Sequence, residues 1–529
     1  MSTRVIMLLE IDWAGSVHRC ATEQVSATVD GVAQLYSVGL SLDYEETLDR
    51  LDLEAPEVGA SFTGTFIFSQ WAALVAQGHR WSTARGTVRM AIEEAGVLGT
   101  PTVLLRGRLR GIEYGDPDQP TGYLRGRVEA LALADTSRVV DQASALTLTA
   151  WPELSYDGLK DGIGRLPALI IGRPGYVLTG TPYTVPAAPA YAVEYRLGPL
   201  IDILILSGAP ITDTSVSVTD GQGHWESFTP ATTTDGAGRL VATVDISGAA
   251  TISRSIGTEY WWACLSTSGP GSFPLASTRP GLGSVVLALL ERSTLEVDHA
   301  RMAPAVEVLD QIEVGCAVTD PDASYWDVAQ ELLQLYPCAV RRGPDGIYVV
   351  PLVQPARSED CAHQLRESVL VNREGPVEVI DVEAPSRVEL AWAIAQDTGT
   401  PSATVLVLTD PTSAGVLVAG AESAIGLTLD LDGAPLRVEA PAVYDQASAR
   451  RAALAQLLAY PPSQERIELT LPAHMHRVEL GQWVSLVSDT LGRTLIGQAI
   501  RRRWDGEQGA WIVSLLCDGA PDRDRAVAP

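Results

Sequence analysis

The chain has 529 residues, of which 46% are apolar and 19% charged, and its 38 Lys and Arg against 65 Asp and Glu give a net charge of −27. This composition excludes a disordered chain, because enough apolar residues are present to build ordinary cores, and the length predicts several domains. The acidic balance argues against a general nucleic-acid binder, since phosphate contacts need a basic face.

Apolar and polar residues alternate along most of the sequence, and 47 Gly and 33 Pro interrupt it at short intervals. This pattern predicts a mainly β, multi-domain protein with few helices. Composition divides the chain into four segments: a β-rich segment at 1–175, a β-sandwich-like insertion at 176–280, an α+β connector with a helix and a hairpin at 281–370, and a β-rich segment with one helix at 371–529.

Five local elements are predicted in chain order. A helix over 82–95 ends at Gly96, and a hairpin follows with strands at 102–114 and 123–133. A helix over 324–336 begins at Ser324 with capping-box spacing, and a hairpin over 338–351 turns at Pro-Asp-Gly. The last helix covers 445–460.

The first hairpin carries arginines at every second position of both strands. Side chains alternate between the faces of a strand, so five arginines are expected on one face and leucines and valine on the other. Three further arginines are consecutive before Trp504. We interpret these residues either as a functional surface, which lines a channel or meets an acidic neighbour at a subunit interface, or as solvated surface. The eight candidates are Arg106, Arg108, Arg110, Arg125, Arg127, Arg501, Arg502 and Arg503.

Motifs of catalysis and cofactor binding are missing from the sequence. It has no phosphate-binding glycine loop, no HExxH and no GxSxG, so we predict no catalytic residue, no cofactor and no metal. His474 and His476 have strand spacing, but no third zinc ligand is visible. Acidic residues 44–54 are interpreted as a solvated face.

The six cysteines have no regular spacing, and the apolar runs fall far below the ~20 residues of a membrane span. We therefore expect reduced thiols, synthesis in the cytoplasm and no stable membrane insertion. The predicted insertion carries four aromatic residues that are either glycan contacts or core: Trp225, Tyr260, Trp261 and Trp262.

The order of elements in the fourth segment resembles the C-terminal part of baseplate hub and tail-tip proteins of tailed bacteriophages. A helix, ARRAALAQLLAYPP, and a strand, RIELTLPAH, precede VELGQWVSLVSD and a closing hairpin. Leu480, Gly481, Gln482 and Val484 stand where those proteins have an L-x-P-G-D-x-V step. The helix and hairpin of 324–351, and the stretch from ALIIGRPGYV to SVSVTDGQG, are also similar to tail proteins of this kind.

The resemblance implies a structural virion protein rather than an enzyme. Segments 1–175 and 371–529 would be two tube-like β-domains of a homotrimeric hub, which adapts a sixfold tail tube to a threefold tip. It further implies contacts with a distal tail or tube protein, the tape measure protein, and tail fibre or central tip proteins. DNA would pass through the channel without specific binding, and the protein would be located in the virion.

Two alternatives stay open at this point. One is a tail-associated peptidoglycan hydrolase, which needs a carboxylate pair that the sequence does not single out. The other is a receptor- or carbohydrate-binding tail module that uses the aromatic residues of the insertion.

Overall fold

A computed structural model describes most of the chain, and strands dominate it, which confirms a mainly β protein with few helices. The described residues are 3–48, 59–67, 74, 76–80, 83–114, 121–130, 135–139, 145–152, 163–172, 188–196, 200–211, 215–219, 224–252, 261–265, 280–353, 355, 358–370, 372–381, 387–394, 401–409, 416–420, 436–459, 463–475, 477–490, 492–506 and 508–518.

The largest sheet joins the two ends of the chain. Its strands are β1 (Thr3–Trp13), β2 (Ser16–Ala21), β3 (Val25–Val29), β4 (Val32–Val38), β5 (Ser41–Thr47), β6 (Gly59–Ile67), β7 (Arg85–Glu94), β8 (Val97–Leu98), β9 (Thr102–Tyr114), β10 (Thr121–Ala130), β22 (His363–Arg366), β23 (Asn372–Asp381), β28 (Ser463–Pro472), β29 (Trp483–Ser488), β30 (Arg493–Asp505) and β31 (Ala510–Asp518). We call β1–β10 the N-terminal β unit, and β22, β23 and β28–β31 the C-terminal β unit.

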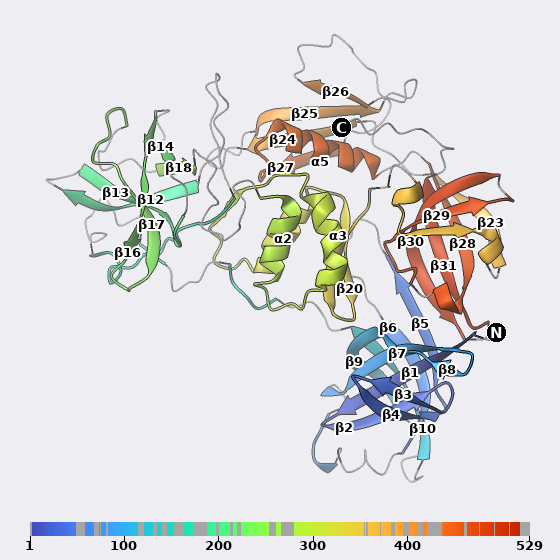
Figure 1. Cartoon of the computed structure of the whole chain (residues 1–529). Coiled ribbons are helices and arrows are strands. Elements are labelled where there is room, and N and C mark those ends of the chain that lie inside the picture. The colour runs from blue at the N-terminus through green and yellow to red at the C-terminus, as the bar shows by residue number, and fades with distance from the viewer. Residues whose placement is uncertain are drawn as a thin grey trace.

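Strand β5 belongs to both units. Residues 41–45 pair with β6, whereas residues 45–47 pair with β30, both antiparallel. In Figure 1, β5 runs from the blue N-terminal unit to the red C-terminal unit. The hydrogen-bond ladder is therefore continuous across the two units, in the order β31-β30-β5-β6-β10-β9-β7-β1.

The two β units also share one hydrophobic core. Trp13 of β1 and Trp511 of β31 are fully buried in it. The ring of Trp511 packs edge-on against Tyr44 of β5 and against Trp504 of β30, with ring centroids 6.0 and 5.1 Å away. Aromatic side chains of this size contribute a large share of core burial, so the units are joined by packing as well as by hydrogen bonds.

A second β-rich part lies within the predicted insertion. Its seven-stranded sheet has the order β15-β14-β18-β12-β13-β17-β16 and stands apart from the β units (Figure 1). The strands are β12 (Ala188–Arg196), β13 (Leu200–Ser207), β14 (Val216–Thr219), β15 (Trp225–Phe228), β16 (Pro230–Thr234), β17 (Leu240–Asp245) and β18 (Trp261–Leu265). Short strand β11 (Leu169–Ile171) pairs with β19 (Cys316–Val318) and ties this part to the connector.

The connector contains helices α2 (Leu282–Leu290), α3 (His299–Leu309) and α4 (Tyr325–Leu333) and the hairpin β20 (Cys338–Gly343) and β21 (Gly346–Pro351). It shares a core with α5 (Gln446–Leu458) and the four-stranded sheet of β24 (Arg387–Ile394), β25 (Pro401–Thr409), β26 (Val416–Gly420) and β27 (Leu436–Ala440). The fourth sequence segment thus contributes to two bodies. Strands β24–β27 and helix α5 join the connector, whereas β23 and β28–β31 belong to the C-terminal unit.

Both predicted hairpins are confirmed, with β9 and β10 antiparallel and β20 and β21 meeting at Gly346, whose φ is 138°. The helices predicted near 324 and 445 are confirmed, and Ser324 and Asp327 form the expected capping box. The helix predicted over 82–95 is wrong. This segment is mostly β7, and Ala95 and Gly96 turn it into β8 with φ values of 52° and 81°.

The turn explains the error, because two successive residues with positive φ close a tight hairpin and cannot continue a helix. Helices α2 and α3 were not predicted from the sequence. Helix α2 is apolar on almost every side, so it shows no amphipathic period.

None of the described helices has both the length and the apolar character needed to cross a membrane.

Candidate functional site

The five hairpin arginines lie on one exposed face of the N-terminal β unit, as the alternation predicts. Leu105 and Leu109 of β9 and Leu124 and Val128 of β10 point into the core and are almost fully buried. The register places Arg110 opposite Arg127, and Arg108 opposite Glu129. Like charges therefore stand side by side on neighbouring strands, an arrangement that destabilises the sheet unless an anion or another carboxylate compensates it.

The same face extends across the junction between the β units. Directly opposed residues of neighbouring strands share a face, so the register traces one row of residues from β30 to β7. The row runs Arg503, Glu45, Gly59, Glu129, Arg108 and Arg85. We call the eight exposed arginines of this surface the arginine face: Arg85, Arg106, Arg108, Arg110, Arg125, Arg127, Arg501 and Arg503.

Only some members of the arginine face have a carboxylate nearby. Arg501 Nε lies 2.7 Å from Glu45 Oε1, and Arg106 Nη1 lies 3.6 Å from Asp345 Oδ1 of the connector hairpin. Arg110 and Arg127 approach Glu129 only to 3.8 and 3.9 Å. Among the described residues, no ion pair is formed by the other members, which are Arg85, Arg108, Arg125 and Arg503.

Arg502 is a correction to the predicted interface. It points to the opposite side of β30 from Arg501 and Arg503, and only 5% of its surface is exposed. Its Nη2 lies 3.0 Å from Glu46 Oε1, its Nη1 donates to Val478 O, and its guanidinium stacks 4.7 Å from the Trp511 ring. A side chain so enclosed within its own chain is not available to another subunit.

Glu46 connects Arg502 to a second buried arginine, Arg341 of β20. Arg341 is 1% exposed, its Nη2 lies 3.5 Å from Glu46 Oε2, and its Nη1 donates to Thr47 O at 2.6 Å. One carboxylate thus neutralises two guanidinium groups that come from the connector and from the C-terminal β unit. Acidic residues 44–54 were expected on a solvated face, and this is wrong for Glu46.

A second ion pair lies next to this one. Arg301 of α3 binds Glu479 with both nitrogens, at 2.8 Å from Nε to Oε2 and 2.6 Å from Nη2 to Oε1. Its Nη1 also donates to Asp298, the cap of α3. These hydrogen bonds raise the pKa of Arg301. Burial alone would raise the pKa of Glu479, but hydrogen bonds from Arg301 and the charges of Arg301 and Arg502 outweigh burial and lower it.

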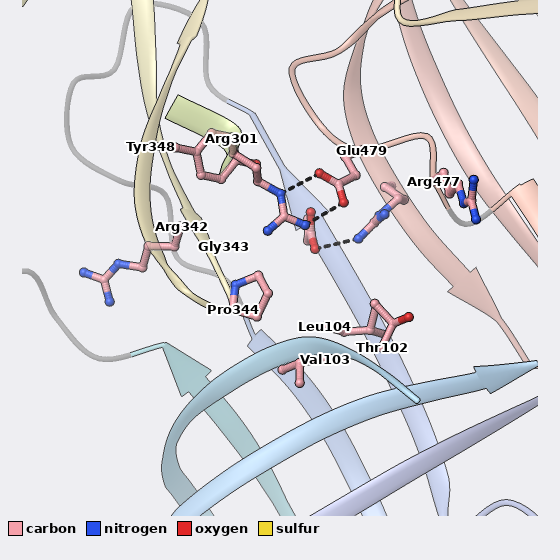
Figure 2. A pocket seen from close by; sticks show the side chains of 12 residues that line it. Thr102, Val103, Leu104, Arg301, Arg342, Gly343, Pro344, Tyr348, Arg477 and Glu479 are labelled. Atoms are coloured by element: carbon pink, nitrogen blue, oxygen red, sulfur yellow. Dashed lines mark hydrogen bonds and ion pairs between the residues drawn. The ribbon is translucent and has the colours of Figure 1, made fainter. Parts of the chain in front are cut away.

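We call these six residues the junction cluster: Glu46, Asp298, Arg301, Arg341, Glu479 and Arg502. Figure 2 shows Arg301 directed at Glu479 between the connector hairpin and the C-terminal unit. The cluster borders a cavity of ≈ 270 Å³ whose other walls include Leu104, Pro344 and Arg477. The two carboxylates that line it are Glu46 and Glu479, and both are ion-paired. Its ion pair with Arg301 and its lowered pKa favour the ionised form of Glu479, whereas the general acid of glycoside hydrolysis must be protonated.

The structure gives no support to a metal site at His474. This residue lies in the 3-10 turn η7 (Ala473–Met475) rather than in a strand, and His476 lies outside the described residues. No cluster of three potential metal ligands occurs in the described part of the chain.

Burial raises the pKa of the thiols of Cys20 and Cys338 to about 12, so these thiols stay protonated.

The four aromatic residues of the insertion are only partly described. Trp225 is half-buried on the edge strand β15, and Trp261 and Trp262 lie on the interior strand β18, whereas Tyr260 is outside the described residues. The register puts Trp225 and Trp262 on either side of Thr219, in one row of the sheet.

The step at Leu480 forms a tight turn before β29. Gly481 has a φ of 81°, and an added Cβ would lie 2.5 Å from Val350 Cγ1, so only glycine fits. Gln482 follows it, and its Oε1 accepts from Glu479 N at 2.9 Å. The turn therefore also positions Glu479 for Arg301.

No protein-family model matches the sequence, and no curated protein matches it either. Several solved structures are similar to the chain. A tail protein from Neisseria meningitidis MC58 is 10% identical, with 99% of both chains covered and a TM-score of 0.36. The 43 kDa tail protein of prophage MuSo2 from Shewanella oneidensis is 7% identical, with 98% of this chain and 100% of that chain covered and a TM-score of 0.35. A chain of the native gene transfer agent virion is 14% identical over 68% of this chain and 87% of that chain, with a TM-score of 0.38.

Proposed function

We propose that the protein is a structural component of a phage tail, the homotrimeric hub of a tail tip or baseplate. The observation that carries the proposal is that each chain holds two β units on one continuous ladder, joined by β5. Three copies around one axis would bring six such units into a ring. That ring would match a sixfold tube on one side and a threefold tip on the other.

In this proposal the N-terminal and C-terminal β units are the two tube-like domains. The junction cluster fixes both to the connector, and the seven-stranded insertion projects from it. The protein works by assembly and by lining or closing a channel, not by turnover. Its partners are the distal tail or tube protein, the tape measure protein, and fibre or central tip proteins, and its location is the virion.

The charge supports a channel that conducts DNA without holding it. A chain with a net charge of −27 repels a polyanion, and binding through counterion release needs a basic surface. We place the arginine face at a contact with another subunit or ring partner, where carboxylates neutralise it, and not on the channel wall.

Sedimentation of the purified chain tests the proposal. We expect a particle of three times the 56.3 kDa chain mass, alone or after mixing with the distal tube protein of the same gene cluster. Electron microscopy of that particle should show a ring with threefold symmetry and six peripheral β units. A chain that stays monomeric at micromolar concentration, with and without the tube protein, contradicts the proposal.

A further inference from the structure

The arginine face carries more positive charge than its own strands neutralise. Eight arginines share it, and the carboxylates among them are the exposed Asp43, Glu45 and Glu113 and the half-buried Glu129. This local excess of positive charge contrasts with the whole chain, which has 27 more acidic than basic residues. Because guanidinium groups form paired hydrogen bonds with carboxylates, a surface of this kind fits a partner with discrete, regularly spaced acidic side chains.

The chain itself offers such a surface on the connector. From residue 302 to residue 340 the sequence has seven Asp and Glu and no Lys or Arg. Four of these carboxylates are exposed on α4 and the turn before it, and we call them the acidic ridge: Asp320, Asp322, Asp327 and Glu331. Asp327 and Glu331 are one helical turn apart and therefore share one side of α4.

The acidic ridge faces away from the core. The buried residues of α4 include Trp326, Val328 and Leu332, which leaves the acidic positions on the outer side of the helix. Among the described residues, no member of the ridge forms an ion pair with any cation, so none is paired with the arginine face of the same chain. The acidic ridge and the four arginines of the arginine face that form no ion pair are thus available for a contact between copies.

We propose that the arginine face of one copy binds the acidic ridge of the next copy. The inference rests on the proposed function and deepens it by naming the two surfaces of the subunit contact. Two different patches meet in such a contact, so it is head-to-tail, and repetition of one head-to-tail contact closes a ring when the rotation allows. The interleaved carboxylates of the arginine face favour a protein partner, because they would repel the phosphates of a nucleic acid.

Charge reversal on each side tests the proposal. Arg108→Glu with Arg125→Glu should convert the trimer to monomer in sedimentation at low micromolar concentration, and so should Asp322→Arg with Glu331→Arg. The combination of all four substitutions should restore the trimer, because each new charge again faces its opposite. All four side chains are exposed, so circular dichroism and the unfolding midpoint should stay near those of the natural chain.

The matched control is Arg366→Glu with Arg450→Glu, two exposed arginines that belong to neither surface. This control changes the net charge as much as the arginine-face variant does, and it should leave the trimer intact. The wild-type trimer should also dissociate as sodium chloride is raised from 0.05 to about 1 M, where exposed ion pairs are screened.

The possible outcomes separate the two proposals. A trimer that survives the arginine reversal overturns the head-to-tail contact but leaves the trimeric hub in place. Dissociation by both reversals without rescue in the combined variant also overturns it, because the two surfaces then have different partners. Binding of a labelled DNA duplex that is lost in the arginine reversal overturns it in favour of nucleic acid. A wild-type chain that never trimerises contradicts the proposed function itself.

Discussion

The molecule uses arginine in two opposite ways, and the junction cluster and the arginine face show the contrast on one strand. In β30, Arg502 points inward and is held by Glu46, whereas Arg501 and Arg503 on either side of it point outward. In β5, Glu46 is buried and Glu45 is exposed. Neighbouring residues of the same type therefore differ in environment, because successive side chains of a strand point to opposite faces. One is buried within the chain, and the next is exposed and can contact another molecule.

The contrast implies different energetic roles. A buried carboxylate between two guanidinium groups cannot be removed without leaving buried charge uncompensated, whereas an exposed ion pair is hydrated in either state. We therefore expect the junction cluster to determine the stability of the single chain and the arginine face to determine assembly. Four substitutions, taken from the largest expected effect to the smallest, test this division.

Glu46→Ala should have the largest effect. It leaves Arg341 and Arg502 buried without their carboxylate, and breaking a buried pair in this way costs about 3–5 kcal/mol of unfolding free energy. Denaturant unfolding followed by tryptophan fluorescence measures it, since Trp504 and Trp511 lie in the same core. The matched control is Glu45→Ala, one residue away on the exposed side, which should cost about 0–1 kcal/mol. Equal losses in the two variants would contradict the division.

Arg301→Lys should have an intermediate effect. Lysine keeps the charge but cannot bind both oxygens of Glu479 and reach Asp298 at the same time, and hydrogen bonds to charged groups contribute about 1.5–3 kcal/mol each. The lower unfolding free energy should appear as a lower denaturant midpoint of the single chain. The mass of the trimer in sedimentation should stay the same. A lysine variant as stable as the natural chain would show that the paired geometry is unimportant.

Glu479→Gln should change how stability depends on pH. The pKa of Glu479 is lowered in the folded chain, so its contribution is present above the ordinary value of 4.5 and is lost as the pH falls through the lower folded value. The difference in stability between the natural chain and the variant should therefore be constant at neutral pH and shrink below pH 4.5. A difference that grows on acidification would have the wrong sign and would contradict the ionised pair.

Arg108→Gln should have the smallest effect on the single chain. The side chain is exposed and forms no ion pair among the described residues, so the unfolding free energy should change by less than about 0.5 kcal/mol. It would even relieve repulsion from Arg85, which is opposite it on β7. A loss of more than about 1 kcal/mol of unfolding free energy in the single chain would show that Arg108, like Arg502, stabilises the fold.

The sequence predicts the arginine face better than the junction cluster, and the reason is the range of the interactions. Alternation over a dozen residues is enough to place Arg106, Arg108 and Arg110 on one side of a strand. The cluster joins positions near 46, 301, 341, 479 and 502, and no local pattern reveals which distant strands meet. A partial signal exists, because Glu46 follows Leu42 and Tyr44 in the buried phase of β5.

Arg502 shows that consecutive arginines of a strand need not share one environment. Three arginines in a row look equivalent in the sequence, but the middle one shares the buried phase of β30 with Trp504. Helix α2 and strand β7 were misjudged for related reasons, since an apolar helix lacks a polar face and a turn of two positive φ values depends on geometry that alanine rarely adopts.

The pairing of β5 with β30 sets a condition on how the chain is completed. Residues 45–47 meet partners at 501–503, which are synthesised more than 450 residues later. Until then, one half of β5 has no strand partner and the hydrophobic core beside it is incomplete. Unpaired strand edges of this kind promote aggregation between nascent chains. We therefore expect the C-terminal strands to pair with β5 only after most of the chain has been synthesised. We expect this step to be slow, because contacts of such sequence separation close the longest loops in the chain.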